Sequence, residues 1–211
     1  MKKLSFVLIA LAGLIVCSIS RANITGIYWW DDGSGAIICS STNWNSADSV
    51  LSMAGSQSGP GQMNGWVKTD SPDDPTLTLS GAVDNDTGFA WTSYQVNVYM
   101  SVLFSFVAPG PSVDNPAPDT PPDDNWFVSG VVAPAWNGSQ YEGTLYFSAG
   151  TPVNIGDELD FTYSIHFASA TQYSFTQEMI PVPEPGAFGL MMVGGFALGG
   201  LAWKRRGNRS T

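Results

Sequence analysis

Acid–base chemistry in this chain would depend on His166, because it is the only histidine. His166 shares a face with Asp160 if the surrounding residues form a strand, but six strand residues then separate the two by about 20 Å. The segment Gly55-Ser56-Gln57-Ser58-Gly59 has glutamine where a nucleophile elbow has its serine. No catalytic triad is indicated, and we expect His166 to be a solvated polar side chain.

Paired carboxylates are the other candidates for catalysis, because a glycoside hydrolase needs two that face each other. Glu142, Glu158 and Glu178 are available, but their spacing along the chain selects no pair. We therefore predict that the protein is not an enzyme, and a secreted hydrolase is kept as an alternative.

Two aspartates in one predicted turn are candidate metal ligands. The turn Asp84-Asn85-Asp86-Thr87-Gly88 begins like a calcium-binding EF-hand loop, but glycine holds its fifth position and no glutamate completes it. Asp84 and Asp86 are thus candidate calcium ligands, with solvated turn aspartates as the alternative. One histidine and one cysteine beyond residue 22 are too few for a zinc site. We expect no other cofactor.

Tryptophan is frequent between residues 23 and 181, where it occurs at positions 29, 30, 44, 66, 91, 126 and 136. Indole rings fill cores, and exposed rings bind ligands by stacking. Trp44, Trp66 and Trp136 lie in turn-rich surroundings, so they are the candidates for stacking against a sugar. Packing within the domain is the alternative for each ring.

Strands must position these residues, because apolar and polar residues alternate as they do in half-buried strands. Between Trp91 and Met100 one face carries Tyr94, Val96, Val98 and Met100. The polar face carries Ser93, Gln95 and Asn97, with Tyr99 as the exception on it. The stretch from Leu159 to Phe167 alternates in the same way. Shorter strands are expected at 64–69, 76–80, 126–133, 141–147 and 173–180. The pattern predicts an all-β fold, an antiparallel β-sandwich of roughly seven to nine strands.

The connections between these strands are predicted from turn residues. Two apolar runs around Asp31-Asp32-Gly33-Ser34-Gly35 predict a hairpin over residues 23–39. Residues 40–60 are rich in Ser, Asn and Gly and predict a loop. Leu103 to Val107 is a candidate partner for the strand from Trp91 to Met100. Residues 109–125 form a Pro/Asp-rich loop in which we expect no regular strand.

Charge is distributed unevenly along the chain. All 18 acidic residues, but only one of the eight basic residues, Lys68, lie between residues 22 and 203, which gives this part a formal charge of −17. Such a domain has no cationic surface for nucleic-acid phosphates or anionic lipid headgroups. We therefore expect no nucleic-acid partner. Cys39 has no partner for an intramolecular disulfide and is expected to be a buried apolar residue.

Both ends of the chain resemble export signals. Residues 1–22 have a basic start, an uncharged apolar run and small residues before a cut after Ala22, as in a signal peptide for Sec export. An uncharged apolar run near the C-terminus predicts one transmembrane helix over about 187–203. The basic cluster Lys204-Arg205-Arg206 that follows marks the cytoplasmic side. The domain between these ends would lie outside the inner membrane.

The C-terminal residues resemble a known sorting signal. Val182-Pro183-Glu184-Pro185, the Gly-rich apolar helix and the basic end resemble the PEP-CTERM signal of exopolysaccharide-producing Gram-negative bacteria. The resemblance implies processing near this motif by exosortase, a membrane-embedded cysteine peptidase. It also implies membrane anchoring by the helix before processing, and then delivery to the cell surface or the extracellular matrix.

These features predict three segments: a signal peptide over 1–22, a β-sandwich ectodomain over 23–181 and a sorting and anchor segment over 182–211. We predict a non-enzymatic structural or interaction role linked to exopolysaccharide, as in a biofilm matrix. A carbohydrate-binding module is the first alternative to this role.

Overall fold

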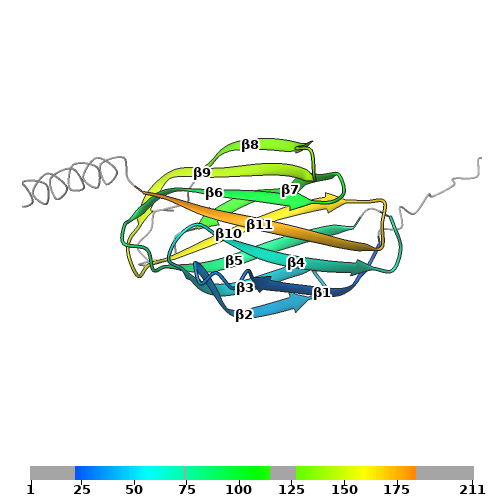
Figure 1. Cartoon of the computed structure of the whole chain (residues 1–211), viewed down its shortest axis with the longest axis horizontal. Helices are drawn as coiled ribbons and strands as arrows, with labels where there is room; N and C mark the ends of the chain where they lie inside the picture. The colour runs from blue at the N-terminus through cyan, green and yellow to red at the C-terminus, as the bar shows by residue number, and fades with distance from the viewer. Residues whose placement is uncertain (1–21, 74, 115–126, 184–211) are drawn as a thin grey trace, which may run out of the picture.

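The computed structural model describes residues 22–73, 75–114 and 127–183, which form eleven strands in two packed sheets (Figure 1). The predicted all-β, sandwich-like architecture is confirmed, with more strands than the sequence indicated. Within these residues no helix is long and apolar enough to cross a membrane. The first 21 residues of the predicted signal peptide and the predicted helix at 187–203 lie outside the described residues.

One sheet has six strands and faces the viewer in Figure 1. All its neighbouring strands are antiparallel. In spatial order the strands are β1 (Ile24–Asp31), β4 (Gly61–Thr69), β11 (Gln172–Pro183), β6 (Trp91–Met100), β9 (Tyr141–Val153) and β8 (Phe127–Trp136).

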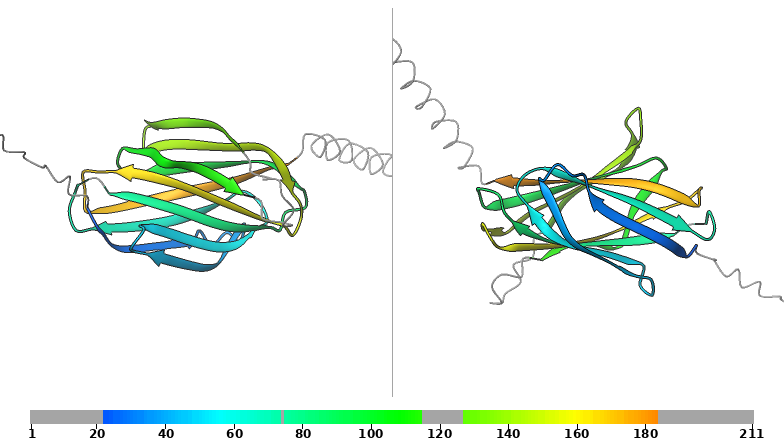
Figure 2. Two further views of the ribbon diagram at one scale, coloured as in Figure 1. Left: turned by 180° about the vertical axis from the view of Figure 1, so that it is seen from behind. Right: turned by 60° about the horizontal axis from the view of Figure 1, so that its bottom comes forward.

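The other sheet has five strands and faces the viewer in the left-hand view of Figure 2, whose right-hand view shows the two layers. Its spatial order is β2 (Ile37–Asn45), β3 (Val50–Gln57), β5 (Thr76–Asn85), β10 (Glu158–Phe167) and β7 (Phe104–Asp114). β3 and β5 run parallel, so the predicted purely antiparallel arrangement holds for all pairs but this one.

The predicted hairpin over residues 23–39 is wrong. β1 pairs with β4 in the six-stranded sheet, whereas β2 pairs with β3 in the five-stranded sheet. The turn between them, with Gly33 and Gly35 at positive φ, therefore carries the chain from one sheet to the other. The predicted loop at 40–60 is also wrong, because β2 and β3 occupy most of it.

Two predictions about β7 are wrong as well. β7 pairs with β10 in the five-stranded sheet and not with β6. It also continues to Asp114, through the first six residues of the predicted loop at 109–125. β7 is an edge strand, and an edge tolerates Pro109 and Pro111 because one side of its backbone needs no ladder hydrogen bond. Residues 115–125 of that predicted loop lie outside the described residues.

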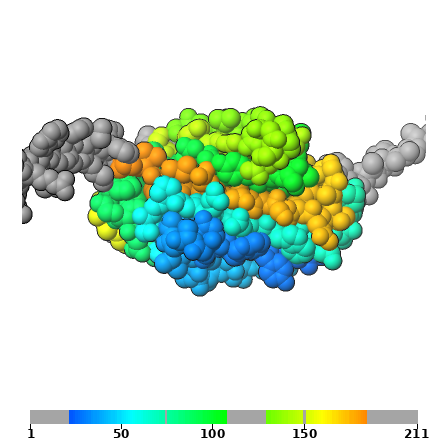
Figure 3. All heavy atoms as spheres, in the orientation of Figure 1, coloured from blue at the N-terminus to red at the C-terminus, as the bar shows by residue number. Residues whose placement is uncertain are grey.

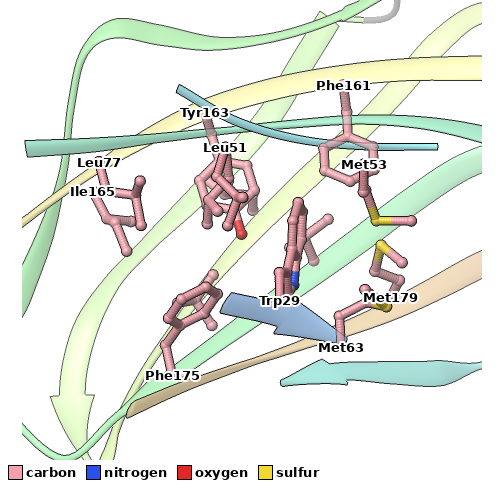
Figure 4. Packing of buried hydrophobic residues seen from close by; sticks show 14 of the residues in the cluster. Trp29, Leu51, Met53, Met63, Leu77, Phe161, Tyr163, Ile165, Phe175 and Met179 are labelled. Atoms are coloured by element: carbon pink, nitrogen blue, oxygen red, sulfur yellow. The ribbon is translucent and has the colours of Figure 1, made fainter. Parts of the chain in front are cut away.

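The core lies between the sheets, and both contribute large side chains to it. Trp29, Met63, Phe175 and Met179 of the six-stranded sheet meet residues of the other sheet such as Leu51, Met53 and Phe161 (Figure 4). The predicted apolar face of β6 is confirmed, because Tyr94, Val96, Val98 and Met100 are all at most 1% exposed. Burial of these alternating faces leaves the opposite side of each sheet for solvent and ligands.

Candidate functional site

The side of the six-stranded sheet turned away from the core is the surface on which exposed aromatic and polar side chains gather. We call it the outer face. Figure 3 looks onto it, with β11 crossing as an orange band between β4 and β6. Residues directly opposite each other on neighbouring strands project from the same side, so the strand register places the outer-face residues in rows.

Two of these rows cross the middle of the outer face. One row runs from β4 to β9 and consists of Gln62, Glu178, Asn97 and Thr144. The next begins on β1 and consists of Trp30, Asn64, Thr176, Tyr99 and Glu142. Residues from five strands, far apart in the sequence, are thus brought onto one surface.

Hydrogen bonds connect the side chains at the centre of these rows. Glu178 Oε2 accepts from Asn97 Nδ2 at 2.8 Å and from the Tyr99 hydroxyl at 2.9 Å. Asn97 Oδ1 accepts from Gln95 Nε2 at 2.8 Å and from the Thr144 hydroxyl at 2.9 Å. We call these five residues the central network. Because each side chain is held by another, their polar groups are fixed before any ligand arrives.

Tyr99 lies on the strand between two that carry carboxylates, Glu178 on β11 and Glu142 on β9. Burial raises the pKa of its phenol most, followed by its hydrogen bond to Glu178 and by the negative charges of Glu178 and Glu142. Tyr99 therefore stays protonated at physiological pH and donates to Glu178. Glu142 accepts from Asn137 Nδ2 at 3.0 Å, so each carboxylate has its own neutral donor.

Aromatic rings line the β1 side of the outer face. Tyr28 is 67% exposed and Trp30 is 48% exposed. The Tyr28 ring lies 5.8 Å from that of Trp66, at a 35° tilt. Trp66 is half-buried, and its ring lies over Gly26, where an added Cβ atom would be 3.5 Å from the indole. We call Tyr28, Trp30 and Trp66 the aromatic edge.

The other two tryptophans predicted to stack on a ligand lie elsewhere. Trp44 is half-buried on β2 in the five-stranded sheet and packs against the core. Trp136 ends β8 and is 55% exposed, with its ring 5.2 Å from that of Tyr141. Trp136 pairs with Tyr141, whereas the preceding residue, Ala135, pairs with Glu142 of the outer face. Because successive residues of a strand point to opposite faces, Trp136 projects from the other side of the sheet. Of the three predicted rings, only Trp66 belongs to the outer face.

The remaining candidate residues do not assemble into a site. His166 is half-buried, with Nδ1 3.4 Å from the Thr76 hydroxyl. Asp84 and Asp86 are both exposed. Among the described residues, no group of three or more His, Cys, Asp or Glu could hold a metal, so calcium at Asp84 and Asp86 stays a prediction without a third acidic ligand.

Cys39 is a free, half-buried thiol rather than a fully buried apolar residue. Its Sγ donates to the Ser41 carbonyl at 3.4 Å. Burial raises the pKa of the thiol, the hydrogen bond to Ser41 opposes this change, and the negative charge of Asp31 adds to it. Cys39 is therefore protonated at neutral pH and poorly suited to be a nucleophile.

The described part of the chain ends inside the predicted sorting segment. β11 continues through Val182 and Pro183, which pair with Ser93 and Trp91 of β6. The bonds to β4 stop earlier, at Met179. Glu184, Pro185 and the basic cluster Lys204-Arg205-Arg206 lie outside the described residues.

Comparison with known protein families matches residues 181–206 to the PEP-CTERM protein-sorting motif. The chain carries a PEP-CTERM sorting signal. This signal makes the protein an exosortase substrate that is exported and anchored at the membrane while it is processed. No curated protein matches the chain.

Proposed function

We propose that this PEP-CTERM protein is a non-enzymatic component of the cell surface or the exopolysaccharide matrix, with the β-sandwich as its interaction domain. The observation that carries the proposal is the outer face itself. A domain sorted for export presents Tyr28 and Trp30 at 67% and 48% exposure beside a connected set of polar groups. Exposed aromatic residues that gather in one patch are typical of an interaction surface.

A non-enzymatic role is supported by the position of Tyr99. Among the described residues, Glu142 and Glu178 are the two glutamates on the outer face, and a hydrolase would need open space between them for the sugar and the attacking water. Tyr99 is on β6, the strand between those that carry the two glutamates, and its hydroxyl is bonded to Glu178 at 2.9 Å. A sugar and a water would have to displace this bond to reach Glu178. The third candidate carboxylate, Glu158, lies on β10 in the other sheet.

Polysaccharide is the partner that suits the charge of the domain. The formal charge of −17 for the part of the chain between the two basic ends repels polyanions such as nucleic acids. Neutral polysaccharides are not repelled by this charge, and their hydroxyl groups can form hydrogen bonds with the amide, hydroxyl and carboxylate groups of the outer face. Sec export, exosortase processing and release from the anchor would bring the domain into contact with that material.

Cell fractionation tests the proposal. We expect the processed protein in the surface or matrix fraction, where mass spectrometry would find neither residues 1–22 nor Lys204-Arg205-Arg206. A strain that makes no exopolysaccharide should release the protein into the medium. Glu184→Ala with Pro185→Ala should leave the chain in the membrane fraction. Full-length protein in the cytosol would contradict the proposed location. Release of soluble reducing sugars from matrix by the wild type, but not by Glu178→Gln, would contradict the non-enzymatic role.

A further inference from the structure

We propose that the outer face binds a neutral polysaccharide as an extended chain that crosses the strands, from the aromatic edge on β1 and β4 to a hollow beside Tyr146 on β9. This inference rests on the proposed function, because a location at the cell surface or in the matrix is what exposes the protein to polysaccharide. It adds the site, the chemical class of the ligand and its direction across the sheet.

The aromatic edge provides a platform for stacking. Tyr28, Trp30 and Trp66 come from two neighbouring strands, and the first two are exposed although their rings carry large apolar surfaces. An exposed ring offers a flat apolar face together with a polar tip. The C–H faces of a sugar ring match that surface, and stacking on it would remove apolar area from water.

The central network supplies polar groups that are already oriented. Asn97 is 6% exposed and Thr144 is 7% exposed, so they form a floor that supports the more accessible Gln95, Tyr99 and Glu178. Only Oε2 of Glu178 accepts hydrogen bonds from the described residues, which leaves Oε1 as an acceptor for a sugar hydroxyl. Groups held in this way lose little conformational entropy when a ligand binds.

Polar residues continue past the centre into a hollow of about 230 Å³. Its lining includes the serines at 93, 129 and 148, together with Gln95 and Tyr146, which is 39% exposed. In the strand order β1-β4-β11-β6-β9, three strands lie between β1 of the aromatic edge and β9 of the hollow. Four strand spacings of about 4.8 Å give a span of roughly 19 Å, so several linked sugars are needed to touch both ends.

The charges on the outer face disfavour an anionic chain. Glu142 and Glu178 lie on it with one cation, Lys68, opposite Gly26 at the β1 side. A polyanion would meet two carboxylates at the centre and the acidic domain around them. A polycation would be attracted by these carboxylates, and salt would weaken that attraction. Contacts between rings and hydroxyl groups persist at high ionic strength, so binding that does not depend on salt identifies a neutral chain.

Binding of purified polysaccharides tests the site. The full-length chain in mild detergent is compared on native gels that contain hydroxyethylcellulose, dextran or galactomannan as neutral polymers, alginate as an anionic polymer and chitosan as a cationic polymer. We expect at least one neutral polymer to retard the protein equally at 0.05 and about 0.5 M salt. Oligosaccharides of increasing length should compete progressively better, and single sugars should not compete.

Matched variants assign the binding to the outer face. Trp30→Ala is expected to weaken binding by about tenfold, while Trp136→Ala, an indole of similar exposure on the other side of the sheet, leaves it unchanged. Neither ring is part of the core, so thermal unfolding should show both variants folded. Should Trp30→Ala nevertheless unfold, Tyr28→Ala takes its place in the comparison.

Several results would overturn the inference. The first is that no neutral polymer retards the protein, or that only alginate or chitosan does. The second is an equal loss of polysaccharide binding in Trp30→Ala and Trp136→Ala. The third is a dimer that Trp30→Ala dissociates, because the outer face would then be a contact between two copies of the chain. These results are separable from failure of the proposed function. A matrix-located protein that binds no neutral polymer contradicts only this inference, and a binding protein found in the cytosol contradicts only the proposed location.

Discussion

The hydroxyl of Tyr94 donates to Oε1 of Gln57 across the core, at 2.5 Å, and so connects β6 of one sheet to β3 of the other. Both side chains are at most 1% exposed. A second bond of the same kind runs in the opposite direction, from Tyr163 of β10 to Gln177 of β11 at 2.8 Å. Two tyrosine–glutamine hydrogen bonds thus join the two sheets through the core. Because hydrogen bonds are directional, they fix the position of one sheet relative to the other more closely than apolar contacts would.

Removal of the Tyr94 hydroxyl should destabilise the domain. Tyr94→Phe leaves Gln57 Oε1 buried without that donor, while Nε2 remains held by the carbonyls of Gly59 and Met179. An unsatisfied buried acceptor costs about 1–3 kcal/mol, so the free energy of unfolding should fall by that amount in urea denaturation. Tyr28→Phe, at a ring that is 67% exposed, is the control and should change it by less than about 0.5 kcal/mol. Equal stability of Tyr94→Phe and wild type would show that Gln57 finds another donor.

Glycine at position 65 accommodates a core aromatic ring. Gly65 on β4 lies directly opposite Phe175 on β11, and an added Cβ atom would be 2.0 Å from Phe175 Cζ. The ring is 2% exposed and packs against Trp29, so it cannot swing away. Gly65→Ala should therefore lower the free energy of unfolding by about 1–3 kcal/mol through overpacking. Gly59→Ala, where nothing lies within 4 Å, is the matched control, and a similar loss in both variants would refute the packing explanation.

The strands that the sequence predicted well are those in which apolar and polar residue types alternate along the chain. β6 and β10 show this pattern, and their bounds agree with the predicted stretches within one residue. β2 was predicted only as far as Cys39, because the rest of it is mostly exposed and, apart from Trp44, polar. β3 was missed because its inward residues include Gly55 and Gln57 beside Leu51 and Met53. Pairing was predicted least well, since β1 with β4 and β7 with β10 are contacts between distant segments that local patterns do not specify.

The site was predictable only in parts. Alternation placed Gln95 and Asn97 on the polar side of β6, and it made Tyr99 an exception that its bond to Glu178 now explains. The strand order β11-β6-β9 places Glu178 and Glu142 on either side of Tyr99. This order could not be predicted from the spacing of the three residues along the chain. One signal was available: period-two alternation through β1 sends Trp29 to the core and Trp30 to the surface.

The carboxyl of Glu158 should make stability depend weakly on pH. Burial raises its pKa most, followed by the negative charges of Asp160 and Asp84. The folded state therefore binds the proton more tightly than the unfolded state, and stability falls as pH rises from the ordinary value through the raised one. Glu158→Gln removes this penalty and should raise the free energy of unfolding at pH 7 by no more than about 0.5 kcal/mol, because the group is largely solvent-screened.

Thermal unfolding across pH is the measurement for Glu158. At pH 3 the carboxyl is protonated in both states, so the wild type and Glu158→Gln should differ less than at pH 7. High salt should reduce the part of the difference that comes from Asp160 and Asp84. A variant that is less stable than the wild type at pH 7 would show that the charged form of Glu158 is favoured in the folded protein.

The end of β11 predicts where the chain can be shortened without loss of the fold. Val182 and Pro183 pair with β6, and Met179 is 0% exposed in the core. A chain that covers residues 23–183 should therefore unfold cooperatively at the same temperature as processed protein from cells.

A chain that stops at Gln177 loses Met179 and the pairing of β11 with β6 beyond that point. Burial of one methionine alone contributes about 1.5–3 kcal/mol, a large part of the 5–15 kcal/mol typical of a domain, so this shorter chain should be unfolded or rapidly degraded. Circular dichroism and limited proteolysis distinguish the two chains. Equal folding of both would mean that the last six residues of β11 add nothing to the sheet, and that exosortase could act well inside it without cost to the domain.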